Sequence, residues 1–172
     1  MFENWPDARF RELTKEVLES LSADDVGSAI AQHVELRVAA EGPEARDDVI
    51  LALPIGTKAI YTTWLVDVEV NNGGFEQFFF SPSSRYAGIA LRGYELLGAE
   101  EYAAIMRAAI ATYESERDVI APHRDAGTLD AFRDSHRHTT LDEVDQRYYA
   151  LGDRIYEAWA DFIRIRPELF AP

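Results

Sequence analysis

The sequence predicts an all-α fold, built as a single-domain multi-helix bundle. Apolar residues recur every three or four positions through most of the chain, which is the spacing of one face of an α-helix. The alternation with a period of two that is typical of half-buried strands is not evident in any segment. No Gly-, Pro- and Ser-rich stretch is long enough to be a linker. We therefore expect one domain over residues 1–172, in which residues 1–50 form acidic N-terminal helices.

Two helices are predicted in the N-terminal part. The first follows Pro6, and its apolar face consists of Phe10, Leu13, Val17 and Leu21. The second begins after Ser22, which together with Asp25 resembles a capping box, and it ends at Gly42. Its apolar face consists of Val26, Ile30, Val34 and Val38.

The next helix, over residues 54–71, is predicted to be nearly buried. Its apolar side chains surround the helix axis except along a strip that contains Lys58, Thr62 and Glu69. The stretch Asn72-Gly73-Gly74 supplies residues that tolerate a positive φ angle, so we expect the helix to end there. Residues 53–98 also carry 8 of the 20 aromatic residues and are almost neutral, which predicts that they form the core.

Helices are also predicted over residues 84–97 and 99–117, and the last helical pattern begins at Thr140. Thr140 and Glu143 are spaced as a capping box. Either one long helix or two helices bent at Gly152 would satisfy the apolar seam that follows. The seam packs either within the chain's own bundle or against a second subunit. It consists of Leu141, Val144, Tyr148, Leu151, Ile155, Ala158, Phe162 and Ile165.

The composition excludes several functional classes. The chain has 17 Lys and Arg against 31 Asp and Glu, a net charge of −14, which excludes direct nucleic-acid binding through a basic groove and disfavours an anionic membrane surface. The absence of cysteine excludes disulfides, thiol catalysis and Cys-ligated zinc. No signal peptide or membrane-spanning stretch is evident, so we expect a cytoplasmic protein.

Asp67 is the polar residue whose position is the least expected, because helical spacing places it among apolar side chains between Ile60 and Val70. A buried carboxylate must be paired, hydrogen-bonded or protonated. It is a candidate general base or metal ligand. The alternative is a structural bond to a nearby Tyr, Arg or turn N–H group, which we favour because no second acid or His lies at matching spacing.

Other catalytic or metal-binding patterns are weak. His136 and His138 form a His-x-His pair, which would need an extended backbone and a third ligand to hold a metal. No Gly-x-Ser-x-Gly elbow and no phosphate-binding loop is present. We therefore expect no metal, no cofactor and no catalytic residue.

Two acidic clusters are candidates for a surface that contacts a basic partner. The first lies in the C-terminal region and consists of Asp142, Glu143, Asp145, Asp153, Glu157 and Asp161. The second, which has only Arg46 within it, consists of Glu41, Glu44, Asp47 and Asp48. Averaged over the molecule, the net charge is about half as dense as that of duplex DNA. Mimicry of DNA therefore requires that the acids gather on one side, whereas a solvated, ion-paired helix face is the alternative.

The stretch from Asp67 to Phe80 resembles the signature of the bacterial DNA-mimic protein family, and the similarity covers roughly residues 50–172. Flanking positions that resemble the same family are Leu53-Pro54, Tyr61, Tyr148-Tyr149 and Pro167-Glu168-Leu169-Phe170. The signature residues are Asp67, Glu69, Asn71, Asn72, Gly73, Gly74, Phe75, Gln77, Phe78 and Phe79.

The resemblance implies an all-helical, acidic homodimer that occupies the DNA-binding surface of a transcription regulator. The signature itself has a structural interpretation. Residues 72–74 cap a helix, the phenylalanines fill the space beneath it, and Glu69 and Gln77 are expected to bond across the turn.

Three functional hypotheses follow. The first is a non-catalytic binding protein that engages a basic DNA-binding protein. The second is an immunity-type protein that neutralises a basic toxin. The third is a small-molecule enzyme built around polar groups beside aromatic residues, namely Asp67, Glu69, Asn71, Asn72 and Gln77.

Overall fold

The structure is a computed structural model that describes residues 6–126, 128, 130–131, 134 and 139–170. All regular elements in these residues are helices, so the predicted all-α fold is confirmed, and no strand occurs among them. The α-helices are α1 (Lys15–Glu19), α2 (Ala23–Glu41), α3 (Arg46–Ala52), α4 (Ile55–Phe80), α5 (Ala87–Leu96), α6 (Glu100–Ala126), α8 (Leu141–Tyr149) and α9 (Arg154–Ile165). Short 3₁₀ turns are Ala8–Arg11, Pro43–Ala45, Pro82–Tyr86 and Pro167–Phe170.

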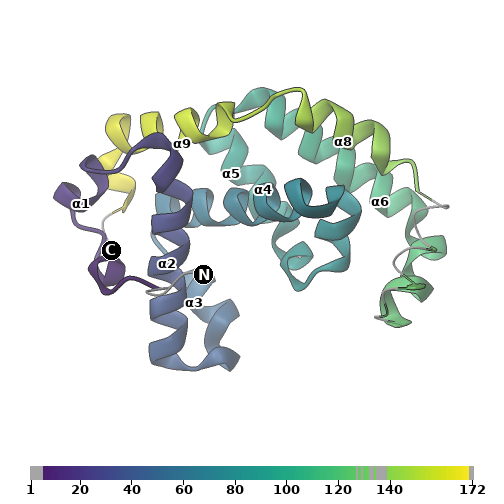
Figure 1. Cartoon of the computed structure of the whole chain (residues 1–172), viewed down its shortest axis with the longest axis horizontal. Helices are drawn as coiled ribbons and strands as arrows, with labels where there is room; N and C mark the ends of the chain where they lie inside the picture. The colour runs from purple at the N-terminus through teal and green to yellow at the C-terminus, as the bar shows by residue number, and fades with distance from the viewer. Residues whose placement is uncertain (1–5, 127, 129, 132–133, 135–138, 171–172) are drawn as a thin grey trace.

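Helix α4 is the central element of the bundle (Figure 1). It packs against α2, α5 and α8, while α9 packs on α2 and α6 covers α5 and α8. Trp159 of α9 is buried, and its indole N–H donates to the hydroxyl of Thr63 on α4 at 3.0 Å. Within the described residues, no helix is both long and apolar enough to cross a membrane.

The prediction of one continuous first helix is wrong. The segment forms a 3₁₀ turn, Ala8–Arg11, followed by the short helix α1. Thr14 separates the two, because its hydroxyl accepts a hydrogen bond from the N–H of Val17 at 3.3 Å and so begins a new helix. Phe10 and Leu18 are the buried side chains of this segment.

Helix α2 follows its prediction closely. Its four predicted apolar side chains are all buried, and it ends at Gly42, which has a φ angle of 105°. The capping box at its start does not form as predicted. The hydroxyl of Ser22 donates to the carboxylate of Asp25 at 2.6 Å and accepts no backbone N–H.

The exposed strip predicted on the central helix is wrong at Thr62. This side chain is buried, and its hydroxyl donates to the carbonyl of Lys58 at 2.9 Å. That bond satisfies the hydroxyl within its own helix, so the side chain can be covered without loss of a hydrogen bond. Lys58 and Glu69 are partly exposed, as predicted.

The two later helices are found close to their predicted bounds, although α6 continues beyond residue 117 and through Pro122. The C-terminal seam forms two helices, α8 and α9, and Gly152 between them has a φ angle of 58°. Most of the seam is buried in the chain's own bundle, but Ile165 is 73% exposed. Thr140 forms no capping bond within α8, and its hydroxyl donates to Glu116 of α6 at 2.7 Å.

Candidate functional site

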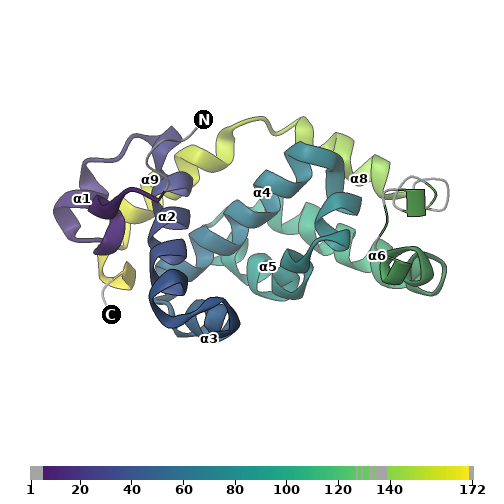
Figure 2. The ribbon, with the colours of Figure 1, turned by 60° about the horizontal axis from the view of Figure 1, so that its bottom comes forward.

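The signature stretch forms a bend in the middle of α4. Gly73 has φ and ψ angles of −168° and 30°, and Gly74 has angles of 74° and −178°, so neither residue is helical. The first helical segment of α4 ends at these glycines, as predicted. A second helical segment follows directly and runs as far as Phe80 in a new direction (Figure 2).

Gly74 is required because of its close approach to α8. A Cβ atom on this residue would lie 2.2 Å from Oδ2 of Asp145, and its backbone angles belong to a region that is almost exclusive to glycine. The other oxygen of Asp145 accepts the N–H of Phe75 at 2.7 Å. Asp145 therefore acts as the N-terminal cap of the second half of α4.

The bend is also secured by two further side-chain bonds. The hydroxyl of Tyr149 donates at 2.8 Å to the carbonyl of Val70, whose helical partner would be the N–H of the non-helical Gly74. The amide of Gln77 donates to the carboxylate of Glu69 at 3.2 Å, so the predicted bond across the turn is confirmed.

Aromatic rings fill the space beneath the bend. Phe75, Phe78 and Phe79 are all buried, as predicted. The ring of Phe75 meets that of Tyr148 edge-on, with centroids 5.6 Å apart, and the ring of Phe79 stacks on that of Tyr113 at 4.2 Å. The signature thus joins α4 to both α6 and α8.

The family model described as DMP19-like protein matches residues 51–166, which include the bend, its partners Asp145 and Tyr149 on α8, and all of α9. The chain belongs to the DMP19-like protein family. No match to it is found among curated proteins or among solved structures. The acidic segment that precedes residue 51 lies outside the matched part of this DMP19-like chain.

Asp67 lies in a buried polar cluster of the DMP19-like core, below the bend. It is 6% exposed, and its carboxylate accepts hydrogen bonds from the hydroxyl of Tyr148 at 2.9 Å and that of Tyr156 at 3.2 Å. The amide of Asn71 donates to it at 3.0 Å. The predicted structural bond to a nearby tyrosine is confirmed.

Burial raises the pKa of Asp67 above its usual value, and the nearby Asp153 acts in the same direction. The bonds from Tyr148, Tyr156 and Asn71 oppose this rise, because they stabilise the ionised form. Burial also raises the pKa of Tyr148 well above its usual value. The tyrosine hydroxyls therefore remain donors at neutral pH.

The polar residues grouped in the enzyme hypothesis do not converge on one opening. Asp67 is buried, Glu69 is bonded to Gln77, and Asn71 and Asn72 are exposed. Among the described residues, no three His, Asp or Glu side chains are placed to hold a metal ion. His136 and His138 lie outside the residues that the structure describes.

The pKa shift at Asp67 predicts a pH-dependent difference between the wild type and Asp67→Asn. The pKa of Asp67 is higher in the folded state than in the unfolded state. At pH values between these two pKa values, the folded state therefore binds more protons than the unfolded state. The wild type therefore loses stability relative to the variant as the pH rises through this window. Urea unfolding of both proteins at about pH 4 to 7 measures the difference, in which the contributions of the other carboxylates cancel. A difference that does not change with pH would contradict the assignment.

The C-terminal acidic cluster lies along one edge of the molecule, which we call the α8–α9 edge. It is formed by α8, residues 150–153 and α9, which follow one another along the top of the view in Figure 1. Its exposed acids are Asp142, Glu143, Asp153, Glu157 and Asp161. Asp145 is a correction to this cluster, because it is 8% exposed and its carboxylate faces the bend.

Two arginines of the α8–α9 edge have acidic partners, one outside the edge and one within it. Arg154 lies three residues before Glu157 in the sequence, but it pairs with Glu101 of α6 at 2.8 Å. Arg164 pairs with Asp161 at 2.6 Å, in agreement with its spacing. The other four exposed acids of the edge form no ion pair with any residue in the described part of the chain. They are Asp142, Glu143, Asp153 and Glu157.

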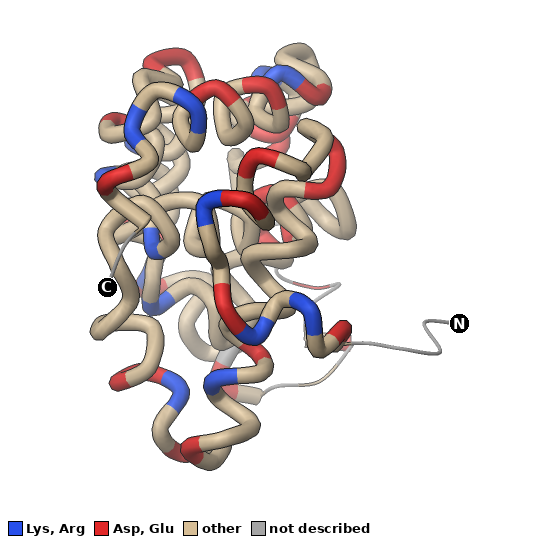
Figure 3. The backbone as a smooth tube through the Cα atoms, turned by 90° about the vertical axis from the view of Figure 1, so that its left-hand side faces the viewer, with Lys and Arg blue, Asp and Glu red and all other residues tan. Residues whose placement is uncertain are grey.

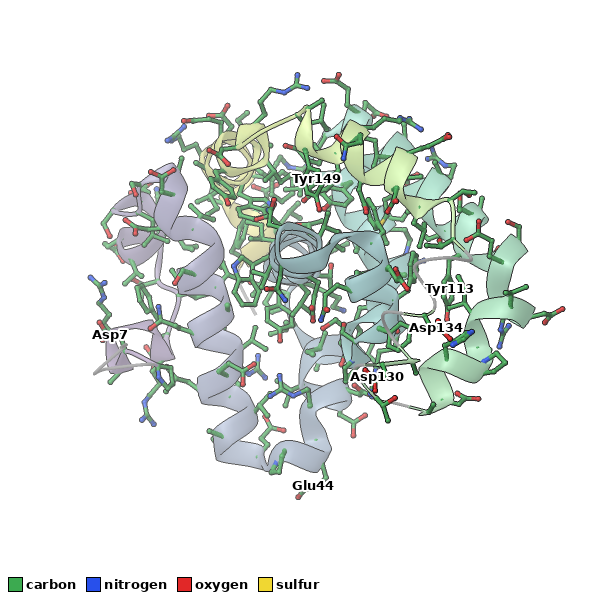
Figure 4. The ribbon with its side chains drawn as sticks, turned by 45° about the vertical axis from the view of Figure 1, so that its right-hand side comes forward. Asp7, Glu44, Tyr113, Asp130, Asp134 and Tyr149 are labelled. Carbon is green, nitrogen blue, oxygen red and sulfur yellow. The ribbon has the colours of Figure 1, made fainter. Side chains whose placement is uncertain are left out.

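The second acidic cluster lies elsewhere, at the corner formed by the end of α2 and the start of α3. Glu44 is on the opposite side of the molecule from Tyr149, the last residue of α8 (Figure 4). Arg46 does not serve this corner, because its guanidinium binds both carboxylate oxygens of Glu35. Asp47 pairs with Arg85 at 2.9 Å. The chain therefore does not join its two acidic clusters into one face.

Ion pairs between residues far apart in the sequence could not be found from spacing. Glu35 with Arg46, Asp47 with Arg85 and Glu101 with Arg154 all depend on the packing of separate helices. Seen from the α1–α2 side, acidic and basic positions are interspersed and do not form one continuous band (Figure 3). The α8–α9 edge is thus the better candidate for an acidic contact surface.

Proposed function

We propose that this chain is an acidic, non-catalytic binding protein that occupies the DNA-binding surface of a basic transcription regulator. The observation that supports the proposal is the exposure of Asp142, Glu143, Asp153 and Glu157 along the α8–α9 edge, without ion-pair partners in the described residues. Arg147 is also exposed on this edge, and it forms no ion pair with any of the described residues. The chain belongs to the DMP19-like protein family, and the contact with a regulator is a proposal added to that membership.

The spacing on α9 suits an imitation of a phosphate backbone. Asp153, Glu157 and Asp161 are four residues apart, and four helical residues advance about 6 Å. Carboxylates on one helix face can therefore follow one another at a spacing that approaches that of phosphates along a strand. Gly152, which has a positive φ angle, lies between α8 and α9, and the two helices follow one another along the length of the molecule (Figure 1).

A homodimer is part of the proposal, because the family resemblance implies one. Two copies would double the length of acidic edge that is available to a partner. Light scattering coupled to size-exclusion chromatography measures the oligomeric state directly. A monomer at all concentrations would remove this part of the proposal, although the edge of a single chain could still be tested.

Selective neutralisation of the two acidic clusters tests the proposed surface. The edge variant carries Asp142→Asn, Glu143→Gln, Asp153→Asn and Glu157→Gln. The control variant carries Glu41→Gln, Glu44→Gln, Asp47→Asn and Asp48→Asn, so both variants change the net charge from −14 to −10. We expect the edge variant to bind a basic DNA-binding protein about tenfold or more weakly, and the control to be nearly unchanged.

The partner is obtained from an extract of the native host at low salt, and competition with duplex DNA is then measured. Binding should weaken steeply between about 50 and 300 mM salt, because the contact is made by exposed charges. Equal losses in both variants would show that only the total charge matters and would contradict a defined edge. Capture of a basic toxin would favour the immunity-type hypothesis instead. The variant Asp67→Asn, if it still binds, argues against a catalytic role for Asp67.

A further inference from the structure

A groove lies between the end of α3, the start of α4 and α5, on a different part of the molecule from the α8–α9 edge. Its volume is about 510 Å³, within the range that is usual for small-molecule sites. Helices α4 and α5 lie side by side along it (Figure 2). It is lined by Leu51, Ile55, Lys58, Ala59, Ile89, Arg92, Gly93, Glu95 and Leu96.

The hollow arises because the two helices approach closely at small residues. A Cβ atom on Gly93 would lie only 3.1 Å from the carbonyl oxygen of Ala59, so α5 rests almost directly on the backbone of α4. Larger aliphatic side chains then form the walls on both sides. Two of them, Leu51 and Ile55, are 54% and 56% exposed. An apolar ligand in the groove would remove this surface from water.

The mouth of the groove is basic, although the chain as a whole is strongly acidic. The ammonium group of Lys58 is held at the groove, because it donates to the carbonyl of Leu51. Arg92 is exposed, and it forms no ion pair with any of the described residues. The acid of the lining, Glu95, is already bound by Arg107 at 2.7 Å. The free charge at the groove is therefore positive.

We propose that this groove binds a single-chain amphipathic carboxylate of about 8 to 12 carbons. Its hydrocarbon chain lies between the walls formed by Leu51, Ile55, Ile89 and Leu96. Its carboxylate is bound by the guanidinium of Arg92, which suits carboxylates, with Lys58 beside it. The site is separate from the proposed contact with a basic protein, and its occupancy does not depend on that function.

Calorimetric titration with octanoate, decanoate and dodecanoate, each below its micelle-forming concentration, tests the site. We expect one ligand per chain and an affinity that rises about fourfold for each added CH₂ until the hollow is filled. The neutral analogue 1-decanol should bind about tenfold or more weakly than decanoate, because it cannot pair with Arg92. Equal affinity for decanoate and 1-decanol, or no saturable binding of any chain length, would overturn the proposal.

Matched variants place the ligand in the groove. Arg92→Gln and Ile55→Asn should each weaken decanoate binding about tenfold. Arg147→Gln and Ile165→Asn, which change an exposed arginine and an exposed isoleucine outside the groove, should leave it within about twofold. An equal effect of the control variants would overturn the proposal. A further pair of results would also overturn the proposal: decanoate does not bind, and Ile55→Asn changes the oligomeric state. These results would show that a second copy of the chain covers the groove.

Discussion

Gly74→Ala is expected to lower the free energy of unfolding by about 4 kcal/mol. The backbone of Gly74, with a φ angle of 74° and a ψ angle of −178°, is strained for any residue that has a Cβ atom. The added methyl group would also displace the carboxylate of Asp145, since Oδ2 lies 2.2 Å from the Cβ position. The charged hydrogen bond to the N–H of Phe75 would be lost with it. Urea unfolding followed by circular dichroism measures the effect.

Two comparisons separate the clash from the backbone strain. Gly98 also has a positive φ angle, 69°, but no atom lies within 4 Å of its Cβ position, so Gly98→Ala should cost only about 1 to 2 kcal/mol. In an Asp145→Ala background, Gly74→Ala should cost less than it does alone, because the clashing carboxylate is already absent. Additive costs would show that Asp145 does not determine the identity of residue 74.

The fold could be predicted largely because helical periodicity reports directly on burial. The apolar face of α2 and the ring cluster of Phe75, Phe78 and Phe79 are examples in which spacing and structure agree. The errors arose where a local bond competes with the pattern. Thr14 begins a new helix within an apolar repeat, and Thr62 satisfies its own hydroxyl and can be buried. Both effects depend on single hydrogen bonds, which hydrophobic spacing does not reveal.

The candidate site was only partly predictable, because it depends on contacts between distant segments. The tyrosine bond to Asp67 followed from its place among apolar residues. The role of Asp145 was missed because the neighbouring acids suggested an exposed cluster. Its spacing of four from Leu141 and three from Tyr148 places it on the buried seam and was a usable signal. Its partner, the N–H of Phe75, lies 70 residues away and no local pattern identifies it.

Asp67→Ala is expected to lower the free energy of unfolding by about 3 kcal/mol. The variant removes the acceptor of three hydrogen bonds at once. Asn71 is exposed and Tyr156 is partly exposed, so water can replace the carboxylate for these two donors. Tyr148 is buried, and the cost therefore arises mainly from its unsatisfied hydroxyl and from the cavity left beside it. Thermal and urea unfolding at neutral pH measure the loss.

Conservative variants show whether the cluster is a structural element. Asp67→Asn keeps an acceptor for Tyr148 and should cost about 1 kcal/mol, and Tyr156→Phe, which removes one of the more accessible donors, should cost less than that. If Asp67→Ala were as stable as the wild type or more stable, the buried carboxylate would not be explained by folding. A residue that a protein retains at a cost to its stability is typical of a functional site. That result would favour the enzyme hypothesis over a binding protein whose interaction surface lies on the α8–α9 edge.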